Sequence, residues 1–354
     1  MFSCSRRAPR WGGGVFAFFP GHTMADEINY GPVLRAYPAD CQPQAAEFLA
    51  GAGGFSGSRL WRLNTPQGLL CLRRWPAEHP TPERLEFIQA VLWHVHQEGF
   101  DRIPLPLETT THQGYVRHAG HLWEITPWFA GAADYHLAPS VPRLRAAMTT
   151  LAAFHSAAAS FPLPQEAECS SPGVAARRNQ LAALRAGGWQ RLQQTVARAN
   201  DSSRAAARIL ECFPRAAEHV QQILDQAVQV KVALVPCLRD IWEENVLFLG
   251  DEVTGLIDAG AMRPENVAAD VARLLGSLAE DDRSAWKVGL AAYESVRPLS
   301  EVELMLVTAF DTSGVLLGGI NWLVWIYEQQ RAFERPEAVQ ARLDYFSRRL
   351  AHLA

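Results

Sequence analysis

Between Lys231 and Leu275 the sequence reads KVALVPCLRDIWEENVLFLGDEVTGLIDAGAMRPENVAADVARLL. Two apolar segments, residues 246–249 and 253–257, flank the turn-forming residues Gly250-Asp251-Glu252. Short β-branched and aromatic runs on either side of such a turn predict a β-hairpin. We therefore expect two antiparallel strands in the second half of the chain, with polar residues at their open end.

Three polar residues stand around this hairpin. Asn245 begins the first predicted strand, Asp258 follows the second, and Asp240 precedes both on a loop. Oxygen ligands of this kind suit Mg²⁺, and a further carboxylate can accept a hydroxyl proton during phosphoryl transfer. Asp and Asn are also common beside turns for conformational reasons alone, and D-x-x-x-x-N by itself is a weak pattern. Followed by two strands and Ile257-Asp258-x-Gly260, the pattern favours a kinase-type catalytic segment.

With these residues in place, the chain resembles the aminoglycoside phosphotransferase and choline kinase superfamily, enzymes with a protein-kinase-like fold. The resemblance rests on residues 238–248, 257–260 and 270–275, the last being similar to the family's D-L-A segment. It implies that Asp240 is the catalytic base and that Asn245 and Asp258 hold Mg²⁺. For Asp270 it implies either bracing of the catalytic loop or capping of a helix.

Two positions depart from the family pattern. The family usually has His-Gly-Asp where this chain has Leu238-Arg239-Asp240, and often has Lys where Arg73 stands. These departures favour an alternative from another class, a pseudokinase-like nucleotide-binding or regulatory protein without turnover. The presence of Asp240, Asn245 and Asp258 favours an enzyme.

Composition bounds the remaining possibilities. The chain has 354 residues, of which 48% are apolar and 20% charged, with a net charge of −4. This is an ordinary globular balance that disfavours general nucleic-acid binding. The six cysteines are scattered without a C-x-x-C pair, which favours a cytoplasmic protein over a disulfide framework or a zinc site. The longest apolar run, Val315 to Tyr327, is too short to span a bilayer, so no membrane association is expected.

The resemblance implies an α+β, two-lobed fold. We expect residues 1–23 to be a disordered or spurious leader, residues 24–127 a β-rich nucleotide-binding N-lobe, and residues 128–354 a larger helical C-lobe. Within the C-lobe, residues 231–275 carry the catalytic hairpin and residues 165–230 a helical insert. Residues 44–50 are expected to form a short helix ahead of the first strands.

A glycine-rich turn precedes a second predicted hairpin, residues 59–73. Backbone amides there can approach phosphates closely because no Cβ intervenes. A flexible turn is the alternative explanation. Given the order of motifs, the resemblance implies that this turn and the next strand bind ATP through Gly53, Gly54, Ser56, Gly57 and the basic residue Arg73.

A helix is predicted over residues 82–98 from its apolar spacing. The resemblance implies an ion pair between Arg73 and an acid early in this helix, either Glu86 or its competitor Glu83. Residues 126–131 resemble the hinge between lobes, which implies adenine contacts from Thr126 and Trp128. Trp128 and Phe129 are also explained by core packing.

The reaction that follows from these features is ATP- and Mg²⁺-dependent phosphorylation of a hydroxyl group on a small molecule. Basic residues outnumber acidic ones between Val174 and Val230, which disfavours a polycationic aminoglycoside and favours a neutral or anionic acceptor. The alternative is that these arginines are the solvated face of amphipathic helices. His155 is expected to be a core residue.

Overall fold

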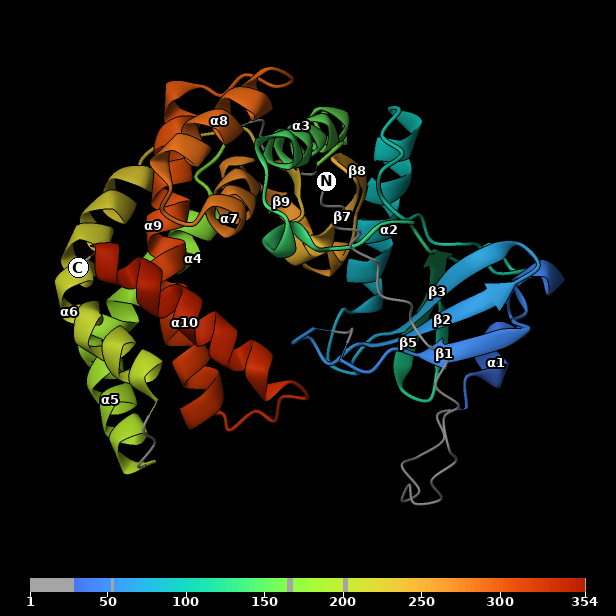
Figure 1. The fold of residues 1–354 in the computed structure, drawn as a ribbon, viewed down its shortest axis with the longest axis horizontal. Coiled ribbons are helices and arrows are strands. Elements are labelled where there is room, and N and C mark those ends of the chain that lie inside the picture. Colours follow the sequence, from blue (N-terminus) through green and yellow to red (C-terminus); the bar gives the residue numbers. More distant parts are fainter. Residues whose placement is uncertain (1–28, 52–53, 164–167, 200–202, 354) are drawn as a thin grey trace, which may run out of the picture.

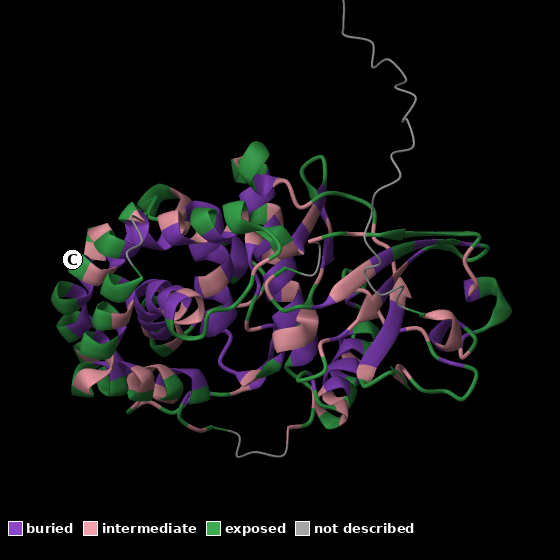
Figure 2. Ribbon diagram, turned by 90° about the horizontal axis from the view of Figure 1, so that it is seen from below, coloured by how far each residue is buried: buried purple, intermediate pink, exposed green. Residues whose placement is uncertain are grey.

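The computed structural model describes residues 29–51, 54–163, 168–199 and 203–353. A β-sheet occupies one end of the molecule and helices fill the other, as the α+β prediction requires (Figure 1). Buried residues line the inner sides of both parts, and exposed residues lie on the outer turns of the helices (Figure 2). The predicted leader, residues 1–23, and Gly53 of the glycine-rich turn lie outside the described residues.

The sheet is antiparallel, with strand order β1-β2-β3-β5-β4. Its strands are β1 (Ala45–Phe48), β2 (Arg59–Thr65), β3 (Gly68–Arg74), β4 (Val116–His118) and β5 (His121–Pro127). Leu63, Leu72 and Ile125 alternate toward one core and are fully buried, and the short helix α1 (Gly31–Leu34) packs into the same cluster. The register sets Arg73 of β3 directly beside Glu124 of β5.

The prediction of a short helix over residues 44–50 is wrong, because residues 45–48 form the edge strand β1. All four residues of β1 are exposed, so the segment has no buried face whose periodicity would distinguish a strand from a helix. The pairing of Phe48 with Trp61 and of Glu47 with Arg62 places the segment along β2. The segment is a strand because its backbone pairs with the edge of β2. The local sequence of residues 44–50 does not reveal this pairing.

The helix predicted over residues 82–98 is confirmed as α2 (Pro82–Gln97). The Thr81 side chain accepts a hydrogen bond from the Arg84 amide at 3.3 Å, and Pro82 stands at the first helical position. Leu85 packs with residues behind the sheet, whereas Ile88 belongs to the core of the helical part. The helix α2 therefore joins the two parts of the molecule.

The helical part is built around one large apolar core. Its helices are α3 (Val141–Ala158), α4 (Pro172–Ala183), α5 (Trp189–Arg198), α6 (Arg204–Ala227), α7 (Ala268–Ala279), α8 (Arg283–Glu294), α9 (Glu301–Leu323) and α10 (Pro336–Leu353). The helices expected in the insert are present as α4, α5 and α6. A kinked π-helical turn (Leu184–Gly188) joins α4 to α5, and its Gly187 has a φ of 112°, which a side chain would disfavour.

The helix α9 continues directly into a π-helical turn (Val324–Glu328), so the helical stretch is longer than its apolar run suggests. By length and composition alone, residues 301–328 would suffice to cross a membrane, but most of the apolar stretch is buried inside the fold. It packs against α6, α7 and α10. The apolar character of α9 is thus used in the protein core.

The hairpin predicted over residues 246–257 is confirmed as β7 (Val246–Leu249) and β8 (Glu252–Leu256), which pair antiparallel. Val246 lies opposite Leu256, so the residues just outside them meet at the open end of the hairpin. A second small ladder joins β6 (Val235–Cys237) to β9 (Arg263–Glu265) and frames the loop between β6 and the hairpin.

Candidate active site

The loop that carries Asp240 is fixed by a buried carboxylate. Both oxygens of Asp270, on α7, accept backbone hydrogen bonds at 2.6 Å, one from the Leu238 amide and one from the Arg239 amide. His155 Nε2 lies 3.1 Å from the same carboxylate, and its Nδ1 lies 2.8 Å from the Tyr293 hydroxyl. Asp270 and His155 are fully buried, so this is a desolvated anchor with each oxygen satisfied. Asp270 braces the loop, one of its two expected roles.

Asp240 itself is exposed at the end of this loop. The indole nitrogen of the buried Trp242 donates to Asp240 Oδ1 at 2.9 Å. Within the described part of the chain, the other carboxylate oxygen has no hydrogen-bond donor, and the residue is exposed. One oxygen is thus oriented and the other is open to a proton from an acceptor hydroxyl.

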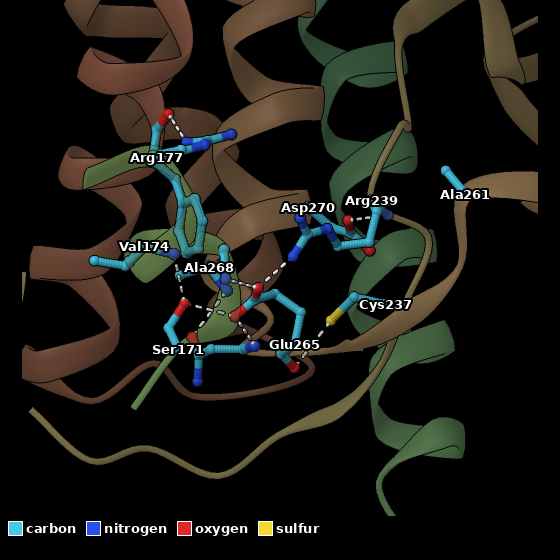
Figure 3. A network of polar contacts seen from close by, with 12 residues as sticks. Ser171, Val174, Arg177, Cys237, Arg239, Ala261, Glu265, Ala268 and Asp270 are labelled. Carbon is cyan, nitrogen blue, oxygen red and sulfur yellow. Dashed lines mark hydrogen bonds and ion pairs between the residues drawn. The ribbon is translucent and has the colours of Figure 1, made fainter. Parts of the chain in front are cut away.

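Arg239 occupies a backbone conformation with φ of 70°, which glycine adopts far more readily than arginine. Its guanidinium forms an ion pair with Glu265, whose side chain is fully buried (Figure 3). Glu265 also accepts from the Ser171 hydroxyl at 2.6 Å and the Gly173 amide at 2.7 Å. The strained backbone is therefore held from both sides, by Asp270 through the amide and by Glu265 through the side chain.

Asn245 and Asp258 meet at the open end of the hairpin, as predicted from the sequence. The Ile257 amide donates to the Asn245 carbonyl at 2.9 Å, so Asn245 lies opposite the residue that precedes Asp258. The Asn245 side-chain oxygen accepts from the Trp242 amide at 3.1 Å, leaving a second lone pair. Asp258 has a left-handed φ of 63°, a conformation in which Asp is tolerated and which recurs at functional sites. An amide oxygen and an exposed carboxylate are ligands that suit Mg²⁺.

Arg73 links the sheet to the hairpin. Its Nη1 lies 2.9 Å from Asp258 Oδ1, and its guanidinium stacks over Trp75 at 4.5 Å from the ring centroid. Burial alone would lower the pKa of Arg73, but the carboxylates of Asp258 and Glu124 outweigh it and raise that pKa. The predicted phosphate-binding arginine thus lies directly at the predicted metal ligand.

The ion pair expected between Arg73 and Glu86 is wrong in this structure. The Glu86 carboxylate instead accepts from the Tyr115 hydroxyl at 2.9 Å. The acid beside Arg73 is Glu124, whose two oxygens accept from Trp75 Nε1 at 3.1 Å and Gln89 Nε2 at 3.0 Å. Burial raises the pKa of Glu124, while Arg73 and these two donors oppose the shift.

Glu124 has a sequence pattern that could have identified it. It stands between Trp123 and Ile125 in an otherwise apolar strand, and a lone acid inside such a strand needs a partner. The helix α2 contributes to this group through the amide of Gln89, rather than through an acid.

The glycine-rich turn closes toward the helical part. Gly54 and Gly57 have φ of 59° and 80°, and an added Cβ at Gly54 would meet nothing within 4 Å. Between them, Phe55 packs edge-on against Trp322, with ring centroids 4.7 Å apart, and lies 6.0 Å from Phe333. The turn is open enough for close approach of phosphate oxygens, and Phe55 ties it to α9 and the segment that follows.

Ser56 and the two hinge residues occupy less distinctive surroundings. The Ser56 hydroxyl accepts from the Ser58 amide at 3.2 Å. Thr126 pairs with Cys71 near the end of β5, and the Trp128 amide donates to Leu69 at 3.0 Å. Their expected adenine contacts stay predictions.

Comparison with known proteins points to one family. Residues 47–303 match the profile of the phosphotransferase enzyme family. A homoserine kinase from Agrobacterium fabrum is 41% identical over 70 residues, which cover 18% of this chain and 22% of that protein. One from Methylobacterium nodulans is 26% identical over 262 residues, covering 72% of this chain and 73% of that protein. The chain thus spans under a quarter of the first relative and about three quarters of the second.

Solved structures support the same fold. An aminoglycoside phosphotransferase from Alicyclobacillus acidocaldarius superposes with a TM-score of 0.62 at 18% identity, covering 94% of this chain and 96% of that chain. An amicoumacin kinase in complex with AMP-PNP, Ca²⁺ and Ami gives 0.62 at 11% identity, covering 92% and 94%. At such low identity the likeness shows the protein-kinase-like fold alone.

Proposed function

Because the chain belongs to the phosphotransferase enzyme family, we propose that it transfers the γ-phosphoryl group of ATP, bound with Mg²⁺, to a hydroxyl group of a small molecule. One observation carries the proposal. An exposed Asp240, on a loop locked by Asp270, stands next to a hairpin whose open end carries Asn245 and Asp258, and Arg73 reaches Asp258 from the sheet.

Asp240 has the properties of the group that takes the hydroxyl proton. Trp242 orients one carboxylate oxygen, and the other remains open to the incoming hydroxyl. Phosphoryl transfer needs little covalent chemistry from the protein, so positioning of this kind is the main contribution.

Asn245 and Asp258 would hold Mg²⁺, since they offer two oxygen ligands at adjacent ends of one hairpin. When bound, the metal neutralises charge on the transferring phosphoryl group. Arg73 would bind phosphate oxygens, for which its planar guanidinium is suited. Its register beside the buried Glu124 keeps it pointed at the hairpin.

The departure at Leu238-Arg239 from the family pattern fits with turnover. Asp270 binds the loop through the backbone amides of Leu238 and Arg239, and these amides are present whatever the side chains. Arg239 adds a contact to Glu265 that a glycine lacks. We therefore favour the enzyme over the pseudokinase-like alternative.

The acceptor is proposed to be neutral or anionic. Arg84 donates to the Ala261 carbonyl at 3.1 Å, beside the hairpin end. Burial and the positive charges of Arg263 and Arg239 lower the pKa of Arg84 to about 10, which indicates a positive potential there. A polycation would be repelled from such a site.

The helical insert supports a neutral or anionic acceptor less strongly than its excess of basic residues suggests. Most of its arginines are exposed on α5, on α6 and on the π-helical turn before α5, as the alternative explanation held. These exposed arginines are Arg185, Arg191, Arg198, Arg204, Arg208 and Arg215. Arg177 differs, because it reaches the Phe310 carbonyl in the interior at 2.6 Å.

Thermal unfolding with and without Mg²⁺–ATP tests the metal–nucleotide site. Nucleotide at about a hundred times its dissociation constant should stabilise the wild type by about 2.7 kcal/mol. Asp258→Asn should lose the Mg²⁺-dependent part of this shift. Exposed Asp251→Asn, in the turn of the same hairpin, is the matched control and should keep it. An unchanged unfolding temperature of the wild type at saturating Mg²⁺–ATP would refute the proposed function.

Removal of the proposed base tests the chemistry separately. Asp240→Asn should lower kcat by about 10²–10⁴-fold, the usual contribution of a positioned base, with the Mg²⁺–ATP stabilisation kept. Turnover can be followed as ADP release with an acceptor found by screening. Loss of nucleotide binding in this variant would instead assign Asp240 to the metal.

A further inference from the structure

A narrow pocket lies in the helical part, and it shares a wall with the proposed base. Trp242 is this wall, because its indole nitrogen hydrogen-bonds to Asp240 and its ring lines the pocket. The other walls come from α4, α7, α9 and α10, and they contribute Arg177, Arg273, Asp311 and Arg349. The pocket is therefore one indole ring away from the carboxylate that would receive the acceptor's proton.

Two of the charged residues that line the pocket, Arg349 and Asp311, neutralise each other. Arg349 binds both oxygens of Asp311, with Nη1–Oδ1 at 3.0 Å and Nη2–Oδ2 at 2.8 Å. Its Nε also donates to Asp281 Oδ1 at 3.0 Å. This bidentate arrangement satisfies the fork of the guanidinium, so Arg349 is committed to the protein.

The two other arginines have no such counter-charge. Arg177 donates only to neutral groups, the Phe310 carbonyl at 2.6 Å and the Ser313 hydroxyl at 3.0 Å. Arg273 stacks on Trp242, with its guanidinium 4.8 Å from the ring centroid. Neither forms an ion pair with any residue that the structure describes.

The pKa of Arg177 agrees with the absence of an ion-pair partner for Arg177 and Arg273 among the described residues. Burial lowers the pKa of Arg177 to about 9, and the positive charges of Arg273 and Arg239 add to the shift. Arginine remains protonated in proteins, so the lowered pKa reports a poorly solvated guanidinium close to other cations, with the carboxylates of Glu265 and Asp311 opposing the shift. Asp311, the acid among the lining residues, is bound by Arg349, so the charges of Arg177 and Arg273 are favourable only where an anion can join them.

We propose, on the basis of the function proposed above, that this pocket binds a carboxylate of the acceptor through Arg177 and Arg273. The acceptor is then a short hydroxy carboxylate, with or without an amino group, whose hydroxyl lies at Asp240 while its carboxylate lies beyond Trp242. A carboxylate matches the planar fork of a guanidinium. A phosphate dianion fits less well, because the Asp311 carboxylate lines the same narrow pocket.

Calorimetric titration of the unliganded protein tests the site without turnover. The probes are γ-hydroxybutyrate and glycolate, each compared with its neutral amide, and inorganic phosphate. Both carboxylates should bind the wild type and the amides should not. Arg273→Gln should weaken carboxylate binding by about tenfold or more, which corresponds to one charge-assisted contact. Arg177→Gln is a second variant with the same expectation.

Arg342→Gln is the matched control. Arg342 also stacks on Trp242, with 3.8 Å from its guanidinium to the ring centroid, but it pairs with Glu244 and does not line the pocket. Carboxylate binding should be unchanged in this variant. Equal binding of acids and amides, no binding of either acid, binding of phosphate alone, or unchanged binding in Arg273→Gln would each overturn the carboxylate site.

A parallel measurement separates this inference from the proposed function. The same proteins are unfolded thermally with Mg²⁺–ATP, which requires no acceptor. Stabilisation by Mg²⁺–ATP without carboxylate binding would remove the carboxylate site and leave the phosphotransferase proposal standing. Carboxylate binding without any effect of Mg²⁺–ATP would remove the phosphotransferase proposal and, with it, the assignment of the carboxylate ligand as an acceptor.

Discussion

Arg239 stands where two requirements on one residue conflict. The loop needs a left-handed backbone to bring two consecutive amides onto Asp270, and a side chain at that position costs about 1–2 kcal/mol. The same side chain supplies the cation that balances the buried Glu265. The ion pair thus offsets the backbone cost, and the network in Figure 3 works as one unit.

This reasoning predicts an unusual order of stabilities at Arg239. Arg239→Ala should lower the free energy of unfolding by about 3 kcal/mol, because it keeps the strain and leaves a buried carboxylate uncompensated. Arg239→Gly also loses the pair but relieves the strain, so it should lose about 1 kcal/mol less. Urea unfolding measures both. Equal stabilities for the two variants would show that the backbone at this residue is unstrained.

At the scale of elements, α7 acts on the catalytic loop through one side chain. Asp270 reaches the loop from the first turn of the helix, where a carboxylate is also favoured by the helix dipole. A neutral amide could accept only one of the two loop hydrogen bonds and would direct an N–H at the other amide. The helix and the loop are therefore coupled through a charge, not through shape.

We expect Asp270→Asn to lower the free energy of unfolding by about 2–3 kcal/mol and to reduce kcat with little change in the KM for ATP. Chemical unfolding and steady-state kinetics measure these quantities. Asp282→Asn is the control, because Asp282 also accepts two backbone amides, at 2.8 and 3.1 Å, but at the exposed start of α8. An equal loss in both variants would mean that the loop anchor has no special role.

The elements show what sequence can and cannot give. The hairpin β7–β8 and the meeting of Asn245 with Asp258 were predictable, because turn chemistry and two adjacent strands determine them locally. The partner of Arg73 was not, since it depends on the register of β3 against β5, strands that lie far apart in the chain. The family resemblance implied Glu86 as the acid beside Arg73, and in the structure that acid is Glu124.

The pockets and buried pairs were harder still to predict. Trp242 and Arg273 meet only because the catalytic loop packs against α7. Glu265 and Arg239 are separated by a complete hairpin, so no local pattern joins them. Sequence motifs identified the chemistry, and the tertiary packing determined its supporting contacts.

For the whole molecule, the glycine-rich turn provides a contact between the sheet and the helical part. Phe55 packs against Trp322 of α9 and against Phe333, although its turn contains glycines and exposed residues. Aromatic pairs of this kind contribute about 0.5–1.5 kcal/mol each. The contact thus favours the arrangement in which the turn lies against the helical part.

Phe55→Ala should therefore raise the KM for ATP by about threefold to tenfold, with little change in the unfolding temperature without ligand. Phe48→Ala is a matched control, because Phe48 is an exposed aromatic residue on the edge strand β1, packed only within the sheet against Trp61. Nucleotide titrations of both variants give the comparison. A similar KM in Phe55→Ala and wild type would mean that the turn is positioned by its backbone alone.

The ion pair between Arg73 and Asp258 joins residues 185 positions apart and connects the two ends of the molecule. Its two members are the proposed binding groups for opposite ligands, phosphate for the arginine and metal for the carboxylate. Either ligand alone must compete with the partner residue, whereas together they release both. If these assignments hold, metal and nucleotide are expected to be heterotropic activators of each other's binding, with a reciprocal coupling free energy that originates in this single contact.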